Sequence, residues 1–360
     1  MNIYRCMNPK VFFITGGCGF IGSNFVRYLL EKTDVKLIIN LDKLTYAGNT
    51  SNLKEFDSDS RYVFIKGDII DSKIVRGIFQ NHNPDCIVHF AAESHVDRSI
   101  DGPSEFVNTN IFGTFTLLQE SLRYHKSLSK KSEMEFRFHH ISTDEVFGSL
   151  GKTGSFSETT PYDPSSPYSA AKASSDHLAR AWHRTFGLPV LITNCSNNYG
   201  PYQFPEKLIP LMVINSLNDK PLPVYGKGEN IRDWLYVEDH CDAVLTVLKN
   251  GIIGETYNIG GRNEIPNLTI VQTICDTLDE IKPRLSGNSY RELITFVTDR
   301  PGHDYRYSID ASKIEKELNW VPNESFETGI SKTIQWYLEH QDWWQEIQAK
   351  IYEQERLGVL

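Results

Sequence analysis

A glycine-rich turn near the start of the chain constrains the fold more than any other feature. The segment Gly17-Cys-Gly-Phe-Ile-Gly22 has the spacing G-x-G-x-x-G, and Gly16 precedes it. Residues 11–15 before the turn form an apolar run typical of a buried strand, and residues 20–31 after it have a helical pattern. Because a strand enters the turn and a helix leaves it, the glycines indicate a site where a dinucleotide pyrophosphate approaches a helix N-terminus.

Short apolar runs alternate with helical patterns through the first half of the chain. Further strands are predicted at residues 37–41, 62–66, 86–90, 136–142 and 190–193. Helical patterns lie between them, for example at residues 110–124 and 167–186, and the polar segment 125–135 is predicted to be a solvated loop. This alternation predicts an α/β fold, a doubly wound parallel sheet of the Rossmann type with helices on both faces.

The pattern loosens after about residue 197, where glycine and proline mark loops at 199–202 and 224–228. Helices are predicted at 237–248, 269–281, 311–318 and 326–339, and a strand at 256–259. We interpret this half as a smaller, partly interleaved substrate domain. The predicted boundaries assign residues 1–198 and 233–263 to the dinucleotide-binding domain, and residues 199–232 and 264–360 to the substrate domain.

Composition excludes several classes of protein. The 360 residues carry a net charge of −9 without a basic block, so nucleic acid is not an expected partner. No run approaches the roughly 18 apolar residues of a membrane helix, and residues 1–10 lack the apolar region of a secretion signal. The six cysteines form no C-x-x-C pair, which is typical of inert thiols in a reducing cytoplasm, and no metal site is expected.

Acidic residues follow the second predicted strand. Asp42 lies 20 residues beyond Gly22, where a carboxylate accepts hydrogen bonds from a ribose diol and repels a 2′-phosphate. This favours NAD over NADP, although the adjacent Lys43 weakens the discrimination. Gly67-Asp68-Ile69 and Ala91-Ala92 follow the next two strands, at the sheet edge where such folds present a ligand.

Tyr168 and Lys172 are four residues apart on a predicted helix and therefore share one face. A nearby ammonium and the positive charge of an oxidised nicotinamide would lower the pKa of the phenol, which is ordinarily near 10. Tyr168 is thus a candidate base toward a substrate hydroxyl. Thr143-Asp144-Glu145 ends the fifth predicted strand, and its two carboxyl groups suggest a further proton transfer beyond simple dehydrogenation.

Taken together, these motifs resemble the dTDP-glucose 4,6-dehydratases, which are extended short-chain dehydrogenases/reductases. The resemblance runs from about Val11 to Trp344, and is carried by the segments 15–22, 42–47, 91–98, 142–148, 168–172 and 300–303. Two positions depart from the family pattern. Cys18 replaces the usual alanine, and Tyr305 stands where arginine is more common, which puts one phosphate or structural contact in doubt.

The resemblance implies a lyase that loses water from dTDP-glucose and forms a 4-keto-6-deoxy sugar nucleotide, most often toward dTDP-rhamnose. Tyr168 takes the O4 proton, Thr143 hydrogen-bonds O4, and Lys172 holds the cofactor ribose. Glu145 removes the C5 proton and Asp144 protonates the departing O6. NAD stays bound and is regenerated in each turnover. The resemblance also implies a homodimer, paired through residues 110–124 and 167–186.

The binding residues that the resemblance implies form two sets. For NAD they are Gly16, Gly19, Phe20, Ile21, Gly22, Asp42, Lys43, Thr45, Asp68, Ile69, Ala91, Ala92, Ser94, Thr109, Tyr168, Lys172 and Asn198. For the sugar nucleotide they are Ser94, Thr143, Asn197, Lys207, Leu208, Pro223, Tyr225, Arg232, Asn267, Arg300, His303 and Tyr307. Arg232 and Arg300 suit a pyrophosphate, and Tyr225 suits stacking on a base.

Two alternatives stay open. A 4-epimerase or another dehydratase acting on a UDP- or GDP-sugar is close, since thymine and uracil differ by one methyl group, worth about 1–3 kcal/mol in a pocket. Epimerases need no acid pair after the threonine, so Asp144 and Glu145 argue against them. A non-catalytic dinucleotide-binding scaffold is the second alternative, and the presence of both Tyr168 and Lys172 argues against it.

Overall fold

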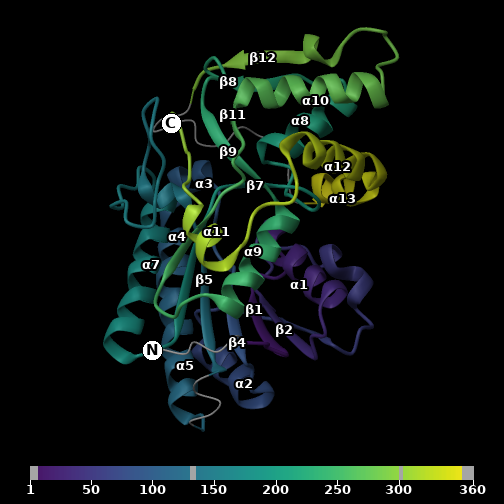
Figure 1. The fold of residues 1–360 in the computed structure, drawn as a ribbon. Helices are drawn as coiled ribbons and strands as arrows, with labels where there is room; N and C mark the ends of the chain where they lie inside the picture. The colour runs from purple at the N-terminus through teal and green to yellow at the C-terminus, as the bar shows by residue number, and fades with distance from the viewer. Residues whose placement is uncertain (1–6, 130–134, 300–302, 351–360) are drawn as a thin grey trace.

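The computed structural model describes residues 7–129, 135–299 and 303–350. A seven-stranded parallel sheet has the order β10-β6-β5-β4-β1-β2-β3 (Figure 1). This order is that of a doubly wound Rossmann sheet with one added strand, and it confirms the predicted fold class. The strands are β1 (Val11–Thr15), β2 (Leu37–Asp42), β3 (Tyr62–Lys66), β4 (Cys86–His89), β5 (Arg137–Thr143), β6 (Val190–Cys195) and β10 (Thr256–Ile259).

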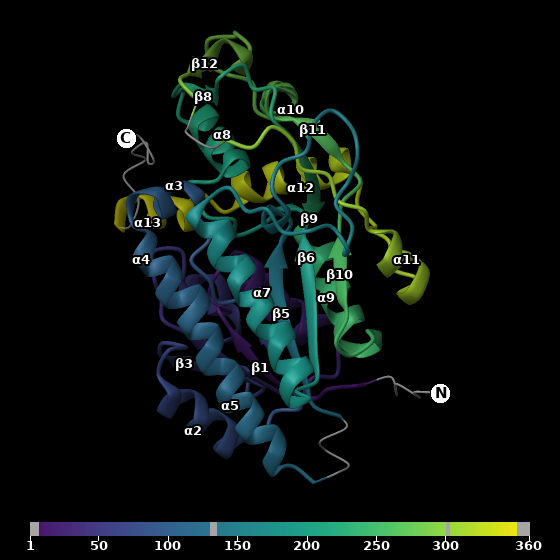
Figure 2. The same ribbon diagram turned by 90° about the vertical axis from the view of Figure 1, so that its left-hand side faces the viewer.

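Helices cover both faces of this sheet because successive side chains of each strand point to opposite sides. In β1, Phe12 and Ile14 belong to one apolar core and Phe13 belongs to the other. The first face packs against α1 (Phe20–Lys32), α9 (Val237–Asn250) and α11 (Ser312–Leu318). The second packs against α2 (Ser72–His82), α5 (Thr114–Ser127) and α7 (Pro167–Phe186), and α5 and α7 lie side by side in Figure 2.

A smaller lobe lies beyond one end of the large sheet, at the top of Figure 1. It has its own apolar core, and one strand connects the two cores. In β9 (Ile231–Tyr236), Trp234 and Tyr236 point into the small core, whereas Leu235 points into the core of the large sheet. The other elements of the lobe are β7 (Asn197–Tyr199), α8 (Leu208–Leu217), β8 (Leu222–Tyr225), β11 (Glu264–Pro266), α10 (Asn267–Ile281), η4 (Tyr290–Leu293), β12 (Ile294–Val297), α12 (Phe326–Glu339) and α13 (Gln341–Lys350).

The lobes share the chain in an interleaved manner, although nothing in the packing tests the predicted boundaries at 198, 232 and 263, which stay a prediction. The remaining elements connect strands of the large sheet. They are η1 (Thr50–Phe56), α3 (Val96–Asp101), α4 (Pro103–Phe106), η2 (Val107–Gly113) and η3 (Asp144–Phe147). No helix within the described ranges has the length and apolar character needed to span a bilayer.

The structure corrects the predicted helix over residues 110–124. Residues 107–113 form a π-helix, η2, and regular α-helix begins only at Thr114. The wider turn accompanies a tertiary contact. The buried Asn110 side chain accepts from Glu93 N at 2.9 Å and donates to Glu93 O at 3.0 Å, which links the turn to the loop after β4. Such π-turns are frequent beside functional sites.

Three predicted loops are also corrected. The polar segment 125–135 begins inside α5, which runs to Ser127, and His125 is buried against Phe136 with 5.9 Å between ring centroids. Residues 130–134 of that segment lie outside the described residues. The predicted loops at 199–202 and 224–228 both overlap the end of a strand. Tyr199 is the last residue of β7, and Val224 and Tyr225 are the last two residues of β8. Both strands are short and are followed by glycine.

Candidate functional site

A cavity of about 300 Å³ opens at the carboxyl ends of the sheet strands, where β1 and β4 diverge. This is the switch point of the strand order, at which doubly wound sheets bind ligands. All of the residues predicted to hold a dinucleotide line it, from the glycine turn to Asn198. Within the described residues, no cluster of His, Cys, Asp and Glu has an arrangement that could hold a metal ion.

The glycine turn brings backbone close to backbone. Gly16 has a φ of +72°, and a Cβ at Gly22 would lie 2.2 Å from the carbonyl oxygen of Gly16. Gly19 caps α1 without a side-chain hydrogen bond, so the first N–H groups of this 13-residue helix face the cavity. These groups suit a pyrophosphate, because unsatisfied N–H donors and the helix dipole both favour negative charge.

Asp42 lies at the end of β2 on the cavity wall. Its carboxylate accepts from Cys18 N at 2.9 Å and Leu44 N at 2.8 Å, which fixes its orientation. Burial raises the pKa of Asp42, and these two backbone bonds oppose the rise. Lys43 forms an ion pair with Asp68 at 2.9 Å, so the cation next to Asp42 is already engaged by a carboxylate from the end of the next strand.

Tyr168 and Lys172 both face the cavity from α7. Lys172 Nζ donates to Ile141 O at 2.8 Å, and the Tyr168 ring packs edge-on against Phe106 with 6.2 Å between centroids. Burial raises the pKa of Tyr168 well above its ordinary value, Glu145 raises it further, and hydrogen bonding with Thr143 opposes the rise. From the sequence we expect the Lys172 ammonium and an oxidised nicotinamide to lower the pKa of Tyr168. In the protein alone this pKa is raised instead, because burial has the larger effect.

Thr143, Asp144 and Glu145 lie where β5 passes into η3. Thr143 Oγ1 donates to Asp144 Oδ1 at 3.3 Å and accepts from Glu145 N at 3.3 Å. Asp144 is 1% exposed, and its second oxygen has no hydrogen-bond partner. Burial raises the pKa of Asp144 well above its usual range, and the charge of Glu145 adds to the rise. At any given pH this group is therefore protonated to a greater extent than a carboxyl group in water.

The residues predicted to bind the sugar nucleotide are divided between two places. Four line the cavity, namely Ser94, Thr143, Asn197 and Lys207. The others that the structure describes belong to the small lobe or to its connections: Leu208 in α8, Pro223 and Tyr225 in β8, Arg232 in β9, Asn267 in α10, and His303 and Tyr307 beyond them. Arg300 lies outside the described residues.

Contacts link several of the second group. The Arg232 guanidinium lies over the Tyr307 ring at 4.3 Å and donates to Asp304 O at 3.0 Å, and its charge lowers the pKa of Asp144. Tyr225 meets His303 edge-on at 6.0 Å. Tyr305 stands where arginine is more common in the family. The residue is 42% exposed, and the hydrogen bond that it donates to Ser149 Oγ at 3.0 Å comes from its backbone N, so this contact does not depend on the side chain.

Sequence reasoning missed part of the cavity wall. Residues that follow β2, β4 and β7, or that lie at the ends of β5 and β6, also line it, including Tyr46, Glu93, Ser142, Cys195, Ser196, Gln203 and Glu206. Ser142 precedes the Thr-Asp-Glu triplet and Cys195 ends a buried strand. Their position at the end of a strand could therefore have identified them as cavity-lining residues. Glu206 had no such signal, since its partner Arg98, at 3.1 Å, is far away in the sequence.

Comparison with known proteins identifies the family. A family model described as GDP-mannose 4,6 dehydratase matches residues 13–333. A dTDP-glucose 4,6-dehydratase of Escherichia coli is 56% identical over 359 residues, covering 96% of this chain and 99% of that protein. One of Neisseria meningitidis is 56% identical over 349 residues, covering 96% of this chain and 98% of that protein.

Solved structures agree with these relatives. A dTDP-glucose 4,6-dehydratase of Bacillus anthracis, in complex with NAD, has 46% identity and a TM-score of 0.83, and the match covers 94% of this chain and 99% of that one. One of Streptomyces venezuelae, also with NAD bound, has 46% identity and a TM-score of 0.85 over 94% and 99% of the two chains. The chain therefore belongs to the GDP-mannose 4,6 dehydratase family and, within it, to the dTDP-glucose 4,6-dehydratases.

Proposed function

We propose that this chain converts dTDP-glucose to dTDP-4-keto-6-deoxyglucose in deoxysugar biosynthesis. The names of the relatives, at 56% identity, support this activity. The single observation that carries the proposal is the adjacent pair of carboxyl groups, Asp144 and Glu145, at the end of β5. The buried Asp144 lines the same cavity as Tyr168 and Lys172. A second acid and base have no task in simple oxidation or epimerisation, whereas elimination of water requires both.

Each side chain then has one role. Tyr168 accepts the O4 proton while C4 is oxidised, and Thr143 hydrogen-bonds O4. Glu145 removes the C5 proton that the new 4-ketone acidifies, and Asp144 gives its proton to O6, which leaves as water. NAD held by the cavity residues would supply the redox chemistry, taking up a hydride from C4 and giving it back at C6. Lys172 would hold the cofactor ribose, and Glu145 returns to C5 the proton that it removed.

Asp144 is suited to the acid role because its carboxyl group is buried away from water. Its charged form is disfavoured by burial and by Glu145, so it holds a proton at a pH where a carboxyl group in water is ionised. Its unpartnered Oδ2 is the atom from which that proton is available. This is the same separation of two carboxyl groups by environment that other acid–base sites use.

The cavity residues fit NAD, and we assign to it the set predicted from the sequence. The close approach of Gly16 and Gly22 and the uncapped start of α1 support the pyrophosphate position, and Asp42 supports a ribose diol rather than a 2′-phosphate. For the sugar nucleotide we assign Ser94, Asn197 and Lys207 together with the predicted residues of the small lobe. Their location on both lobes supports a substrate that lies between them.

We also propose that the chain pairs as a homodimer through η2, α5 and α7. Supporting this, Phe112, Phe115 and Phe186 are 55%, 40% and 47% exposed on these neighbouring elements. Trp182 joins them, edge-on to Phe115 at 5.7 Å and to Phe186 at 5.4 Å. A contiguous exposed aromatic patch is typical of an interface. The five described cysteines, all buried and unpaired, support a cytoplasmic location.

Incubation with dTDP-glucose and UDP-glucose side by side, followed by mass spectrometry, tests the activity and the base preference. We expect loss of one water from dTDP-glucose and faster turnover than with the uracil compound. With deuterium at C4, the label should appear at C6 of the product. An isomer of unchanged mass would instead indicate an epimerase, and no reaction together with no bound NAD would oppose the proposal.

A further inference from the structure

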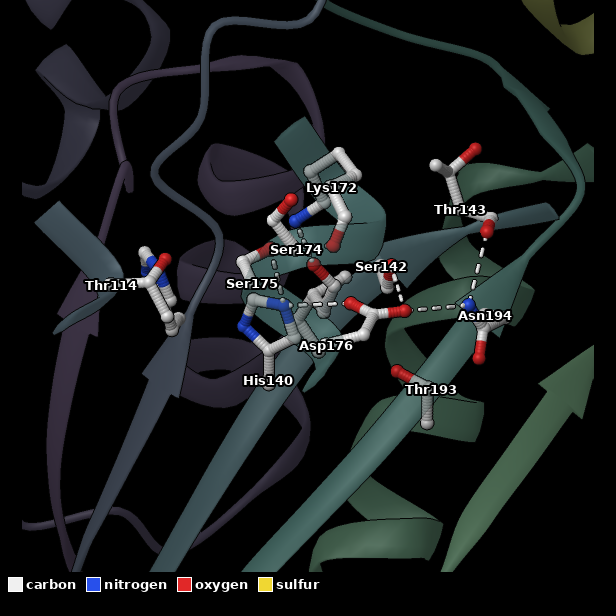
Figure 3. Close-up of polar contacts among 12 residues, drawn as sticks. Thr114, His140, Ser142, Thr143, Lys172, Ser174, Ser175, Asp176, Thr193 and Asn194 are labelled. Carbon is white, nitrogen blue, oxygen red and sulfur yellow. Dashed lines mark hydrogen bonds and ion pairs between the residues drawn. The ribbon is translucent and has the colours of Figure 1, made fainter. Parts of the chain in front are cut away.

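A buried polar cluster lies next to Lys172, between α7 and the strands β5 and β6 (Figure 3). Its centre is Asp176, whose side chain has no exposed surface. Asp176 follows Lys172 by four residues, just as Lys172 follows Tyr168, so the three lie along one face of α7. The proposed chemistry uses the first two and leaves the third without a role.

Asp176 receives hydrogen bonds from four side chains. His140 Nε2 lies at 3.0 Å, Ser142 Oγ at 2.9 Å, Tyr162 OH at 2.8 Å and Asn194 Nδ2 at 3.3 Å. An ionised carboxylate without partners would be very costly at this depth. The donors offset that cost: bonding to His140 and Ser142, together with the Lys172 charge, keeps the pKa of Asp176 below its usual value despite burial.

The same donors hold the end of β5. Asn194 Nδ2 bonds both Asp176 and Thr143 O, the latter at 3.0 Å, and Ser142 directly precedes Thr143. Lys172 Nζ bonds Ile141 O one residue earlier. Figure 3 shows the resulting chain of contacts from Asp176 through Asn194 to Thr143. Because Asp144 and Glu145 continue from Thr143, the position of the whole reacting triplet depends on this junction.

Asp176 is also the charge that opposes desolvation of Lys172. Burial lowers the pKa of Lys172, and Asp176 is the largest influence in the other direction, followed by Cys195. The other titratable groups facing Asp176 are His140, Tyr162 and Arg180; burial lowers the pKa of His140 to about 4, so it is neutral. Arg180 reaches Asp176 through Tyr162, whose hydroxyl accepts from Arg180 at 2.6 Å.

We propose that Asp176 is a positioning residue for the oxidation step: through Ser142 and Asn194 it fixes Thr143, and it places a negative charge one helical turn from Lys172 on α7. This inference rests on the proposed function. The substitution Asp176→Asn tests this, because it keeps the shape and removes the charge. Asp239→Asn is the control, since Asp239 is also buried, at 4% exposed. It lies in α9, accepts from Glu324 N at 2.8 Å, and is not among the residues that line the cavity.

The readouts are kcat, KM, the pH profile of kcat, the amount of co-purified NAD and the thermal unfolding midpoint. For Asp176→Asn we expect kcat to fall about tenfold or more with KM nearly unchanged. The alkaline limb of the profile should move to lower pH, because Lys172 then loses its proton more easily. Asp239→Asn should leave kcat and the profile unchanged even if it lowers the unfolding midpoint.

Ser142→Ala is the second variant, and it decides the matter if Asp176→Asn does not fold. It removes one bond and keeps the charge, so kcat should fall while the alkaline limb stays in place. The proposal is overturned if Asp176→Asn leaves kcat and the alkaline limb of the pH profile unchanged, or alters only the stability of the enzyme. It is also overturned if Ser142→Ala has the kcat of the wild type. A wild-type enzyme that releases no water from dTDP-glucose is a failure of the proposed function instead.

Discussion

At the scale of single residues, the environment of a side chain decides its chemistry. Tyr168 and Asp144 both have a raised pKa from burial, but the consequences differ. A neutral carboxyl group is already the acid that the elimination step requires. A neutral phenol must lose its proton as C4 is oxidised, and the positive charge of an oxidised nicotinamide acts in the favourable direction.

Replacement of Tyr168 by Phe tests the proton acceptor. The ring contact with Phe106 is kept, so the unfolding midpoint should stay near that of the wild type. The rate of C4 oxidation should fall by about 10²-fold to 10⁴-fold, the usual contribution of a positioned acid or base. Single-turnover formation of the reduced cofactor measures this step directly. A variant that oxidises C4 at the wild-type rate would refute the role.

Replacement of Asp144 by Asn tests the acid and its cost to stability. Folding of the wild type takes up a proton at Asp144, so its stability falls as pH rises from the ordinary carboxyl pKa toward the raised value. Asn needs no proton. As pH rises through this window, the free energy of unfolding of the variant should therefore increase relative to that of the wild type by up to about 1.4 kcal/mol per pH unit. Unfolding midpoints between acidic and mildly alkaline pH would show a widening difference.

The same variant should lose water elimination more than oxidation. Asp144→Asn and Glu145→Gln are expected to accumulate the 4-keto intermediate and the reduced cofactor, since only the later proton transfers are impaired. Rapid-quench mass spectrometry separates the two steps. Equal losses in both steps would contradict the division of roles between these carboxyl groups and Tyr168.

At the scale of elements, a comparison of Gly22 in the first strand–turn–helix unit with Gly77 in α2 shows where the fold requires glycine and where it does not. A Cβ at Gly22 would overlap the Gly16 carbonyl at 2.2 Å, whereas a Cβ at Gly77, inside α2, meets nothing within 4 Å. The first position sets the distance between α1 and the turn. The second only adds backbone freedom to a helix.

Gly22→Ala and Gly77→Ala form a matched pair. We expect Gly22→Ala to lower the free energy of unfolding by about 1–3 kcal/mol, as overpacking does, and to release NAD. Gly77→Ala should raise the free energy of unfolding by about 0.5–1 kcal/mol, because alanine is the better helix former. It should leave the NAD content unchanged. Denaturant unfolding and cofactor absorbance measure both effects. Retained NAD in the Gly22 variant would oppose the assigned pyrophosphate position.

At the scale of the whole molecule, the exposed aromatic patch on η2, α5 and α7 predicts the oligomeric state. Phe115→Asp places a charge in the centre of this patch and should convert a dimer to a monomer. Phe296→Asp is the control, because Phe296 is 57% exposed on β12 in the other lobe. Light scattering coupled to size-exclusion chromatography measures the mass. A Phe115 variant that stays a dimer would contradict the proposed interface.

Much of the fold could be predicted because it depends on local patterns. The strands β1 and β2 are mostly apolar runs, and α7 is bounded by its Ser166 capping box and by Gly187 in the left-handed conformation. The π-helix at 107–113 could not be predicted, because it accompanies a bond between Asn110 and the distant Glu93 backbone. The strands β7 and β8 were missed because they are short and end at glycine-rich turns.

The amino-acid sequence by itself determined the alternation of strands and helices, the glycine turn and the presence of a tyrosine, a lysine and an acid pair, because these are properties of neighbouring residues. Only the tertiary structure decided which carboxyl group has a raised pKa and which has a lowered one. Asp144 and Asp176 have the same side chain, but one is buried with an unpartnered oxygen and the other among four donors. That difference is made by segments up to 36 residues away along the chain, brought together by the packing of α7 on the sheet.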